Sequence, residues 1–409
     1  MDGFRKDADA IVKASIEAVL PDEAVARALK DYKRPAGRLV LVAAGKAAWQ
    51  MASAAAKIIS VDEGFVITKY DHVMGEIPGV RCFEAGHPVP DQNGFDATGK
   101  VLEAVGPLSE DDEVLFLLSG GGSALFEKPL IPGEELQDIT RQLLAAGADI
   151  VEMNTIRKRL SGVKGGRFAL ACAPARVYSI VLSDILGDPL DMIASGPAYP
   201  DGSTCEEAVE IAGRYGLKLS DRVWQLLRQE TPKQLDNVST EITGSVRELC
   251  RAAAAECERL GYETEILTDR LDCEASDAGR WLGEMAAYNA GKGAKKAFIA
   301  GGETVVHLRG DGLGGRNQEL ALAAAPAVAG LEAAVFSFGS DGTDGPTDAA
   351  GGYVDGDTAA LLEKAGVSIY GALSDNDAYH ALKACGGLIM TGPTGTNVND
   401  AAVVLTGKA

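Results

Sequence analysis

The chain has 409 residues, of which 46% are hydrophobic and 24% charged, a composition typical of a folded protein with two or three domains. Its formal net charge of −20 disfavours nucleic acid and anionic membranes as partners. The seven cysteines lack CxxC spacing, Met1–Asp9 has no apolar leader, and no apolar run has membrane-spanning length, so we expect a cytoplasmic protein without a membrane partner.

Strands and helices alternate in the first half of the chain. Helical spacing at residues 9–20 and 22–30 precedes an apolar strand at 38–44, which leads into Gly45, Lys46 and an alanine-rich helix. The remaining elements predicted here are strands at 64–69, 80–85, 113–118 and 176–182 and helices at 92–105, 134–146 and 151–160. This alternation predicts a parallel sheet covered on both faces, with ligands bound beyond the carboxyl ends of its strands.

The second half resumes the α/β alternation after a polar stretch at 229–243 that shows no periodicity. We interpret that stretch as the boundary between a domain at 1–238 and a smaller α/β domain at 239–409. The elements predicted beyond it are helices at 245–260, 277–290 and 317–329 and strands at 263–268, 296–300, 303–308, 333–338 and 387–390.

A glycine run follows the strand at 113–118. Its residues are Ser119, Gly120, Gly121, Gly122 and Ser123. Because glycines let backbone N–H groups approach a phosphate, this run is a candidate phosphate cradle, and a simple tight turn is the alternative. Lys46 stands at the end of an earlier strand, where it is either a compact charge for an anion or an ordinary surface lysine.

Basic residues gather in the helix predicted at 151–160. Asn154 and Arg157 lie one helical turn apart, and Lys158 follows. In a chain this acidic, such a cluster is a candidate contact for substrate or phosphate. The alternative is a solvated helix face with paired charges.

Two carboxylates, Asp184 and Asp188, follow the strand at 176–182. Phosphoryl transfer needs carboxylates that hold Mg²⁺ or orient the attacking hydroxyl, so both are candidate metal ligands and Asp184 is also a candidate catalytic residue. Helix capping and turn formation are the alternatives.

The segment 310–315 matches GxGxxG and precedes a predicted helix that begins with Arg316 and Asn317. A lone match is a weak sign of a dinucleotide site, and no acidic residue ends a second strand at the required distance. We therefore favour contact of Arg316 with a carboxylate or phosphate and keep an NAD(P)H-dependent reductase as the alternative. Asp341, Asp344 and Asp348 lie among glycines in a loop that either binds a cation or is an Asp-Gly turn.

Short motifs along nearly the whole chain resemble the class II glycerate 2-kinase family, whose second domain is called MOFRL. They lie at 44–47, 85–91, 118–124, 154–161, 182–188, 194–197, 301–304, 314–319, 339–345 and 391–397. The resemblance implies a large Rossmann-like domain, a smaller α/β domain and a cleft between them. It also implies transfer of the γ-phosphoryl group of ATP to D-glycerate, giving 2-phosphoglycerate and ADP with Mg²⁺.

The resemblance also implies roles for single residues. Lys46 and Arg316 match the family residues most closely tied to activity. The matched motifs add Glu303, Asn317, Asp341 and Asn397 as candidate substrate or nucleotide contacts. The expected partners are glycerate and ATP, a homodimer is possible, and hydroxypyruvate reductase, a label often given to family members, is the rival function.

Overall fold

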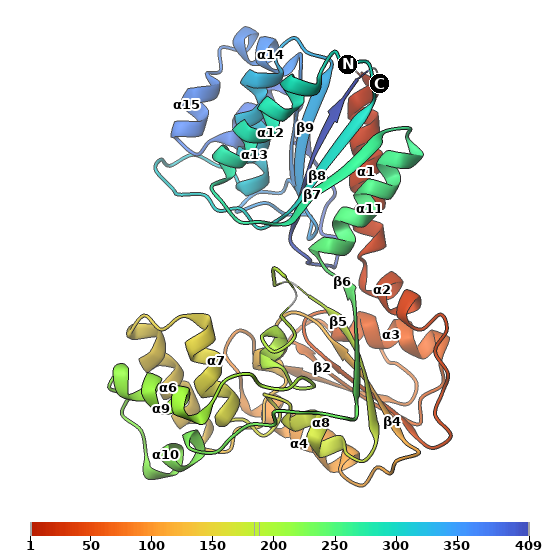
Figure 1. The fold of residues 1–409 in the computed structure, drawn as a ribbon, viewed down its shortest axis with the longest axis vertical. Coiled ribbons are helices and arrows are strands. Elements are labelled where there is room, and N and C mark those ends of the chain that lie inside the picture. The colour runs from red at the N-terminus through yellow and green to blue at the C-terminus, as the bar shows by residue number, and fades with distance from the viewer. Residues whose placement is uncertain (1, 184, 188, 408–409) are drawn as a thin grey trace. The chain divides into compact units, whose positions relative to one another are not determined.

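The computed structural model describes residues 2–183, 185–187 and 189–407 and divides into two compact units (Figure 1). The continuous unit is Ala24–Thr243. The discontinuous unit combines Met1–Glu23 with Gly244–Ala409. Each unit has its own six-stranded sheet.

The sheet of the continuous unit contains β1 (Leu39–Ala44), β2 (Glu63–Lys69), β3 (Val80–Ala85), β4 (Glu113–Leu118), β5 (Arg176–Leu182) and β6 (Val238–Gly244). Their order in the sheet is β3-β2-β1-β4-β5-β6, and β1 to β5 pair in parallel. The order reverses between β1 and β4. In doubly wound sheets, ligands bind at such a reversal, beyond the carboxyl ends of the two strands.

Helices enclose this sheet. They are α2 (Pro21–Ala28), α3 (Ala48–Ile58), α4 (Gln92–Val105), α5 (Gly122–Leu125), α6 (Gly133–Ala145), α7 (Ile150–Arg159), α8 (Arg167–Cys172), α9 (Cys205–Arg214) and α10 (Asp221–Leu227), with a short 3-10 helix, η1 (Ile193–Ser195). All six residues of β1 are buried because alternate side chains enter two cores. Val40 and Val42 pack with residues of α4 and α8, whereas Leu39 and Leu41 pack with residues of α2 and α3. A continuous apolar run is therefore what a strand covered on both faces requires.

The sheet of the discontinuous unit is mixed. Its strands are β7 (Glu263–Leu271), β8 (Lys296–Gly302), β9 (Ala333–Gly339), β10 (Gly351–Asp355), β11 (Leu388–Ile389) and β12 (Asp400–Thr406). The order is β11-β10-β9-β12-β8-β7, with β12 antiparallel to both β8 and β9. The start of β12 therefore lies at the same sheet edge as the ends of β8 and β9, and Asp400 stands opposite Gly302 and Gly339.

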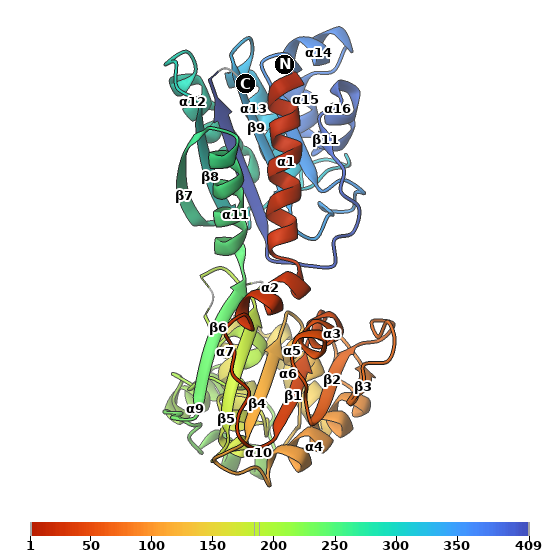
Figure 2. The same cartoon turned by 90° about the vertical axis from the view of Figure 1, so that its right-hand side faces the viewer.

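The helices of the discontinuous unit are α1 (Asp2–Ala18), α11 (Val246–Arg259), α12 (Ala275–Asn289), α13 (Arg316–Val328), α14 (Thr358–Lys364), α15 (Ile369–Ser374) and α16 (Ala378–Cys385). The two views show α1 beside α11 (Figures 1 and 2). Arg5 ties α1 to β11 and the turn before it by donating to the carbonyls of Gly386 and Leu388 at 3.1 and 2.9 Å, and Tyr262 donates to Asp7 at 2.7 Å. Among the described residues, no helix combines the length and apolarity needed to cross a bilayer.

The predicted α/β class, with a Rossmann-like parallel sheet in the first part, is confirmed. The division of the chain differs from the expected 1–238 and 239–409. The first helix packs with the discontinuous unit, because its apolar face meets α11 and the nearby sheet, and β6 is still part of the first sheet. The sequence also did not predict β10 or β12, and residues 303–308, expected to form a strand, contribute only an isolated bridge at Val305.

Candidate functional site

Two loops meet at the reversal of the parallel sheet. The loop after β1 carries Gly45 and Lys46, and the loop after β4 carries Ser119 and Gly120. The backbone N–H of Lys46 donates to the Gly120 carbonyl at 2.9 Å, and the Ala47 N–H donates to the Ser119 hydroxyl at 3.0 Å. The structure thus brings the predicted glycine run next to Lys46. The hydrogen bond between Ala47 and Ser119 joins residues that are 72 positions apart along the chain.

The glycine run leaves backbone donors free. Gly121 has a φ of +85°, and a Cβ there would lie 3.2 Å from Lys46 Cγ and 3.1 Å from two atoms of the His87 ring. A larger residue would therefore be strained and would push both side chains away. Within the described part of the chain, the N–H groups of Gly120, Gly121 and Ser123 donate no hydrogen bond. Three free amides beside an exposed lysine provide a group of positively polarised donors that suits phosphate oxygens.

A hydrogen-bonded cluster supports the far side of this loop. The Ser123 and Ser195 hydroxyls lie 3.0 Å apart, and Ser195 donates to Asn154 Oδ1, also at 3.0 Å. Arg157 Nη2 donates to the Ser123 carbonyl at 3.2 Å. Ala194 and Ser195 have φ values of +49° and +62°, a region that residues with a Cβ rarely occupy. Two of the predicted contacts, Asn154 and Arg157, thus converge on the glycine run, and burial lowers the pKa of Arg157.

Lys158 has a different environment from its neighbours in α7. Its residue is only 2% exposed, and its ammonium group lies 3.0 Å from Asp201 and 3.4 Å from Asp191. These ion pairs hold Lys158 inside the unit, so its charge is paired as the alternative supposed but is buried rather than solvated. Asp184 and Asp188, the predicted metal ligands, lie outside the described residues.

Sequence analysis missed two groups of this site. His87 lies in the matched motif at 85–91 but was not among the candidate site residues, and its ring lies beside Gly121 and Lys46. Burial lowers the pKa of His87, with a further contribution from the charge of Lys46, and both effects favour the neutral imidazole. Ser195 belongs to a matched motif, but its link to Ser123 and Asn154 depends on an unusual backbone conformation that its sequence does not signal.

In the discontinuous unit, Arg316 is the first residue of α13 and reaches two carboxylates. One Arg316 nitrogen contacts Glu303, just beyond β8, and another lies 3.1 Å from Asp400 at the start of β12. The antiparallel insertion of β12 explains this meeting, because it brings Asp400 to the edge where β8 ends. The guanidinium fork is about a third exposed, so an incoming anion can compete with Glu303, which is itself exposed.

Asp344 fills the amino-terminal end of α13. Its carboxylate accepts from the backbone N–H groups of Asn317 and Gln318 at 3.1 and 2.9 Å. Burial raises the pKa of Asp344, and the hydrogen bonds from these two amides partly offset that effect. The donors that a pyrophosphate would need at this helix are therefore already engaged by the protein's own carboxylate.

The glycines of the segment 310–315 have a packing role. A Cβ at Gly310 or Gly312 would lie 2.1 to 2.8 Å from atoms of Asp375 or Asp377, and one at Gly315 would lie 2.3 Å from Asp344. The segment also begins well after β8, which ends at Gly302, whereas a dinucleotide fingerprint follows its strand directly. The GxGxxG match is therefore not a nicotinamide cofactor site.

The remaining candidates differ in accessibility. Asn317 is 1% exposed, and its amide group contacts Ser337 and Asp344, so the side chain faces inward. Asp341 is partly exposed and accepts from the Thr343 N–H at 2.9 Å. Asn397 is exposed and accepts from the Asn399 N–H at 3.3 Å. Asp341 and Asn397 can thus meet a ligand, whereas Asn317 shapes the site from within.

Asp400 makes the stability of the folded protein depend on pH. Burial raises its pKa from 3.8 to about 7, and the Arg316 charge partly offsets the rise. Between these values the folded protein holds a proton that the unfolded chain has released, so stability falls as the pH rises from about 4 to about 7. Asp400→Asn removes this titration.

We therefore expect the wild type to lose on the order of 4 kcal/mol relative to Asp400→Asn over this pH range. Urea unfolding followed by circular dichroism at a series of pH values measures the difference. Parallel stability profiles for the two proteins would contradict the assignment.

Comparison with known proteins places these features in one class. A domain of unknown function, DUF4147, matches residues 7–228, and the MOFRL family matches residues 296–400. The chain therefore combines a DUF4147 domain with a MOFRL domain.

The relatives identify the family within that class. A D-glycerate 2-kinase of Thermotoga maritima is 52% identical over 413 residues, which cover 99% of each chain. A glycerate 2-kinase of Pyrococcus horikoshii is 40% identical over 386 residues, 90% of this chain and 87% of that one. The crystal structure of a Thermotoga maritima glycerate kinase matches with a TM-score of 0.94 at 51% identity and covers 99% of this chain and 100% of that one. The chain belongs to the class II glycerate 2-kinase family, as its motifs predicted.

Proposed function

We propose that this protein is a kinase that transfers the γ-phosphoryl group of ATP to the 2-hydroxyl of D-glycerate, giving 2-phosphoglycerate and ADP. The observation that carries the proposal is the group of free amides at Gly120, Gly121 and Ser123 beside Lys46, at the reversal of a parallel sheet. The names of the relatives, D-glycerate 2-kinase and glycerate 2-kinase, support the same reaction.

In this proposal the glycine run receives nucleotide phosphates. The amides donate to phosphate oxygens, and Lys46 neutralises charge that develops on the transferring group. Arg157 and the pair Asn154–Ser195 hold the loop in place through Ser123. Because phosphoryl transfer depends mainly on positioning and charge stabilisation, such fixed donors are the contribution required of a protein.

Arg316 serves the same reaction from the discontinuous unit. Its guanidinium group binds the glycerate carboxylate or the phosphoryl oxygens by replacing the exposed Glu303 as a partner. Asp400, which is buried, stays paired and orients the fork. Asp341 and Asn397 line the approach to the acceptor as candidate contacts.

Mg²⁺ is the metal that ATP chemistry implies, and it would neutralise phosphate charge. In the described part of the chain, the group with metal-like spacing is Cys205, Glu206 and Glu230, whose thiol does not suit Mg²⁺. Asp341, which forms no ion pair among the described residues, is a fitting oxygen donor, and so is Glu303 once an anion replaces it on Arg316. Asp184 and Asp188 remain candidate ligands from the sequence.

Two expectations from the sequence accompany the proposal. All seven cysteines are free thiols, which fits a reducing compartment such as the cytoplasm. A homodimer stays a prediction from the family.

The deciding experiment incubates the protein with ATP, Mg²⁺ and D-glycerate and identifies the phosphorylated product by ³¹P NMR. We expect the resonance of 2-phosphoglycerate. Loss of NADH absorbance with hydroxypyruvate, without use of ATP, would instead establish the reductase, which the filled helix end at Asp344 argues against.

A further inference from the structure

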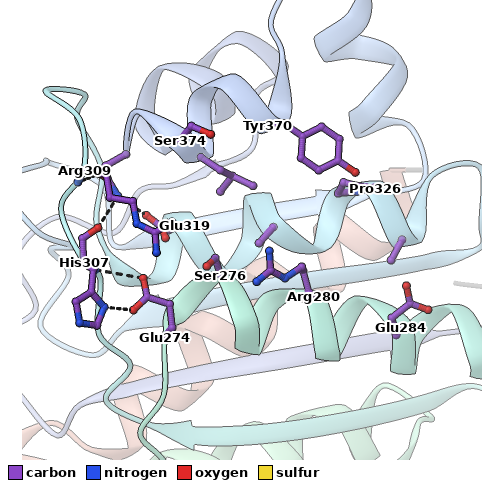
Figure 3. Close-up of a pocket in the computed structure, with 14 residues that line it drawn as sticks. Glu274, Ser276, Arg280, Glu284, His307, Arg309, Glu319, Pro326, Tyr370 and Ser374 are labelled. Atoms are coloured by element: carbon purple, nitrogen blue, oxygen red, sulfur yellow. Dashed lines mark hydrogen bonds and ion pairs between the residues drawn. The ribbon is translucent and has the colours of Figure 1, made fainter.

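The discontinuous unit contains a cavity that the proposed reaction does not use. Its volume is about 290 Å³, and its walls come from α12, α13, α15 and the segment between β8 and α13 (Figure 3). Figure 3 shows Arg309 and Arg280 on either side of Ser276, with Tyr370 across the cavity. Charged groups of both signs thus share one space with an aromatic ring.

Glu319 is the buried acid of this cavity. The residue is 5% exposed, and its carboxylate accepts a hydrogen bond from Asn376 Nδ2 at 3.2 Å. Burial raises the pKa of Glu319, and the Asn376 hydrogen bond and the Arg309 charge partly offset the rise. Among the described residues, Glu319 forms no ion pair. A carboxylate held in a cavity with only an amide partner lacks the cation that would stabilise it most.

The cations of the cavity lie nearer to solvent. The side chain of Arg309 is exposed and, within the described part of the chain, forms no ion pair. Arg280 pairs with Asp277 on its own helix. Glu274 is engaged by His307, which contacts it through both a ring nitrogen and the backbone. Arg309 is therefore the cation most open to a ligand anion.

Apolar groups complete the walls. Ala323 and Pro326 of α13 and Leu373 and Tyr370 of α15 line the same cavity. Their surfaces can bury a hydrocarbon or aromatic body a few atoms away from the charged groups.

We propose that this cavity binds an apolar α-amino acid as a zwitterion. The ligand ammonium group pairs with Glu319, its carboxylate pairs with Arg309, and its side chain lies against Pro326, Leu373 and Tyr370. A simple anion would place its charge near Glu319 and Glu284, and a simple cation would face Arg309 and Arg280, so a ligand with both charges fits the walls best.

Titration calorimetry on the whole protein tests this site with L-phenylalanine and L-leucine. The matched probes are 3-phenylpropanoate, which lacks the ammonium group, and 2-phenylethylamine, which lacks the carboxylate. We expect an amino acid to bind and each analogue to bind at least about tenfold more weakly, because each lacks one of the two ion pairs, to buried Glu319 or to exposed Arg309.

Glu319→Gln and Arg309→Gln are expected to weaken amino-acid binding at least about tenfold each. Glutamine at 319 keeps an oxygen for Asn376 and preserves the shape of the side chain, and Arg309 is exposed, so at least one variant retains the fold by circular dichroism. Glu363→Gln, an exposed change on α14 away from the cavity, is the control and should bind like the wild type.

Absence of amino-acid binding to the wild type would overturn the proposal. So would equal binding of either analogue, or unchanged binding by folded Glu319→Gln and Arg309→Gln. None of these results depends on glycerate phosphorylation, so the failure of this site and the failure of the proposed kinase are distinguished.

Discussion

Replacing Lys46 with glutamine is expected to lower kcat for glycerate phosphorylation by about 10²–10³-fold, as for loss of one charge-stabilising donor. The lysine lies beside free amides at the carboxyl ends of β1 and β4, where charge on a transferring phosphoryl group would develop. Its side chain is exposed, so glutamine should leave the fold intact. Release of ADP in a coupled assay with D-glycerate measures the effect.

Lys57→Gln is the matched control. Lys57 is an exposed lysine in the last turn of α3, the helix that begins just after Lys46, and it should keep the wild-type kcat. If Lys46→Gln, folded by circular dichroism, also turned over at the wild-type rate, Lys46 would have no part in the chemistry.

Arg316→Gln is expected to cost about 10³-fold or more in kcat, the scale of an arginine that stabilises phosphoryl-transfer charge. The change also removes the counter-ion of Asp400, so the Asp400 carboxyl should hold its proton to a higher pH than in the wild type. Because Arg316 is about a third exposed, the accompanying loss of stability should stay below about 2 kcal/mol. Steady-state kinetics and urea unfolding measure the two effects.

Arg316→Lys separates geometry from charge. A lysine keeps the positive charge but loses the fork that contacts Glu303 and Asp400 together, so we expect it to recover only a small part of the lost activity. Arg270→Gln, an exposed change in the same unit, is the control. Full activity of folded Arg316→Gln would remove this residue from the mechanism.

The local features of the continuous unit could be predicted from the sequence. Strand β4 is an apolar run that passes directly into three glycines, and both periodicity and turn chemistry identify such a junction. The proximity of Lys46 and Gly121 could not be predicted from the sequence, because it depends on β1 and β4 being neighbours in the sheet. Strand order is set by packing over the whole unit rather than by any local pattern.

The environment of Arg316 shows most clearly what could not be predicted from the sequence. Sequence reasoning identified the arginine and Glu303 but missed Asp400, which starts a strand that was not predicted. The apolar residues after Asp400 fit a buried strand or a helix segment equally well over so short a length. Asp400 reaches Arg316 only because β12 lies between β8 and β9, whose sequences come far earlier in the chain.

The docking of α1 has a consequence for synthesis on the ribosome. Residues 24–243 emerge as one uninterrupted stretch and can fold while the rest of the chain is still being made. The first helix, by contrast, emerges before its partners, since α11 and the carbonyls of Gly386 and Leu388 belong to the later part of the chain. Its apolar side chains, including Phe4, Ile11 and Ile16, therefore lack their native partners in the nascent chain at least until α11 has been made. The discontinuous unit can therefore complete its fold only after segments on both sides of residues 24–243 have been made.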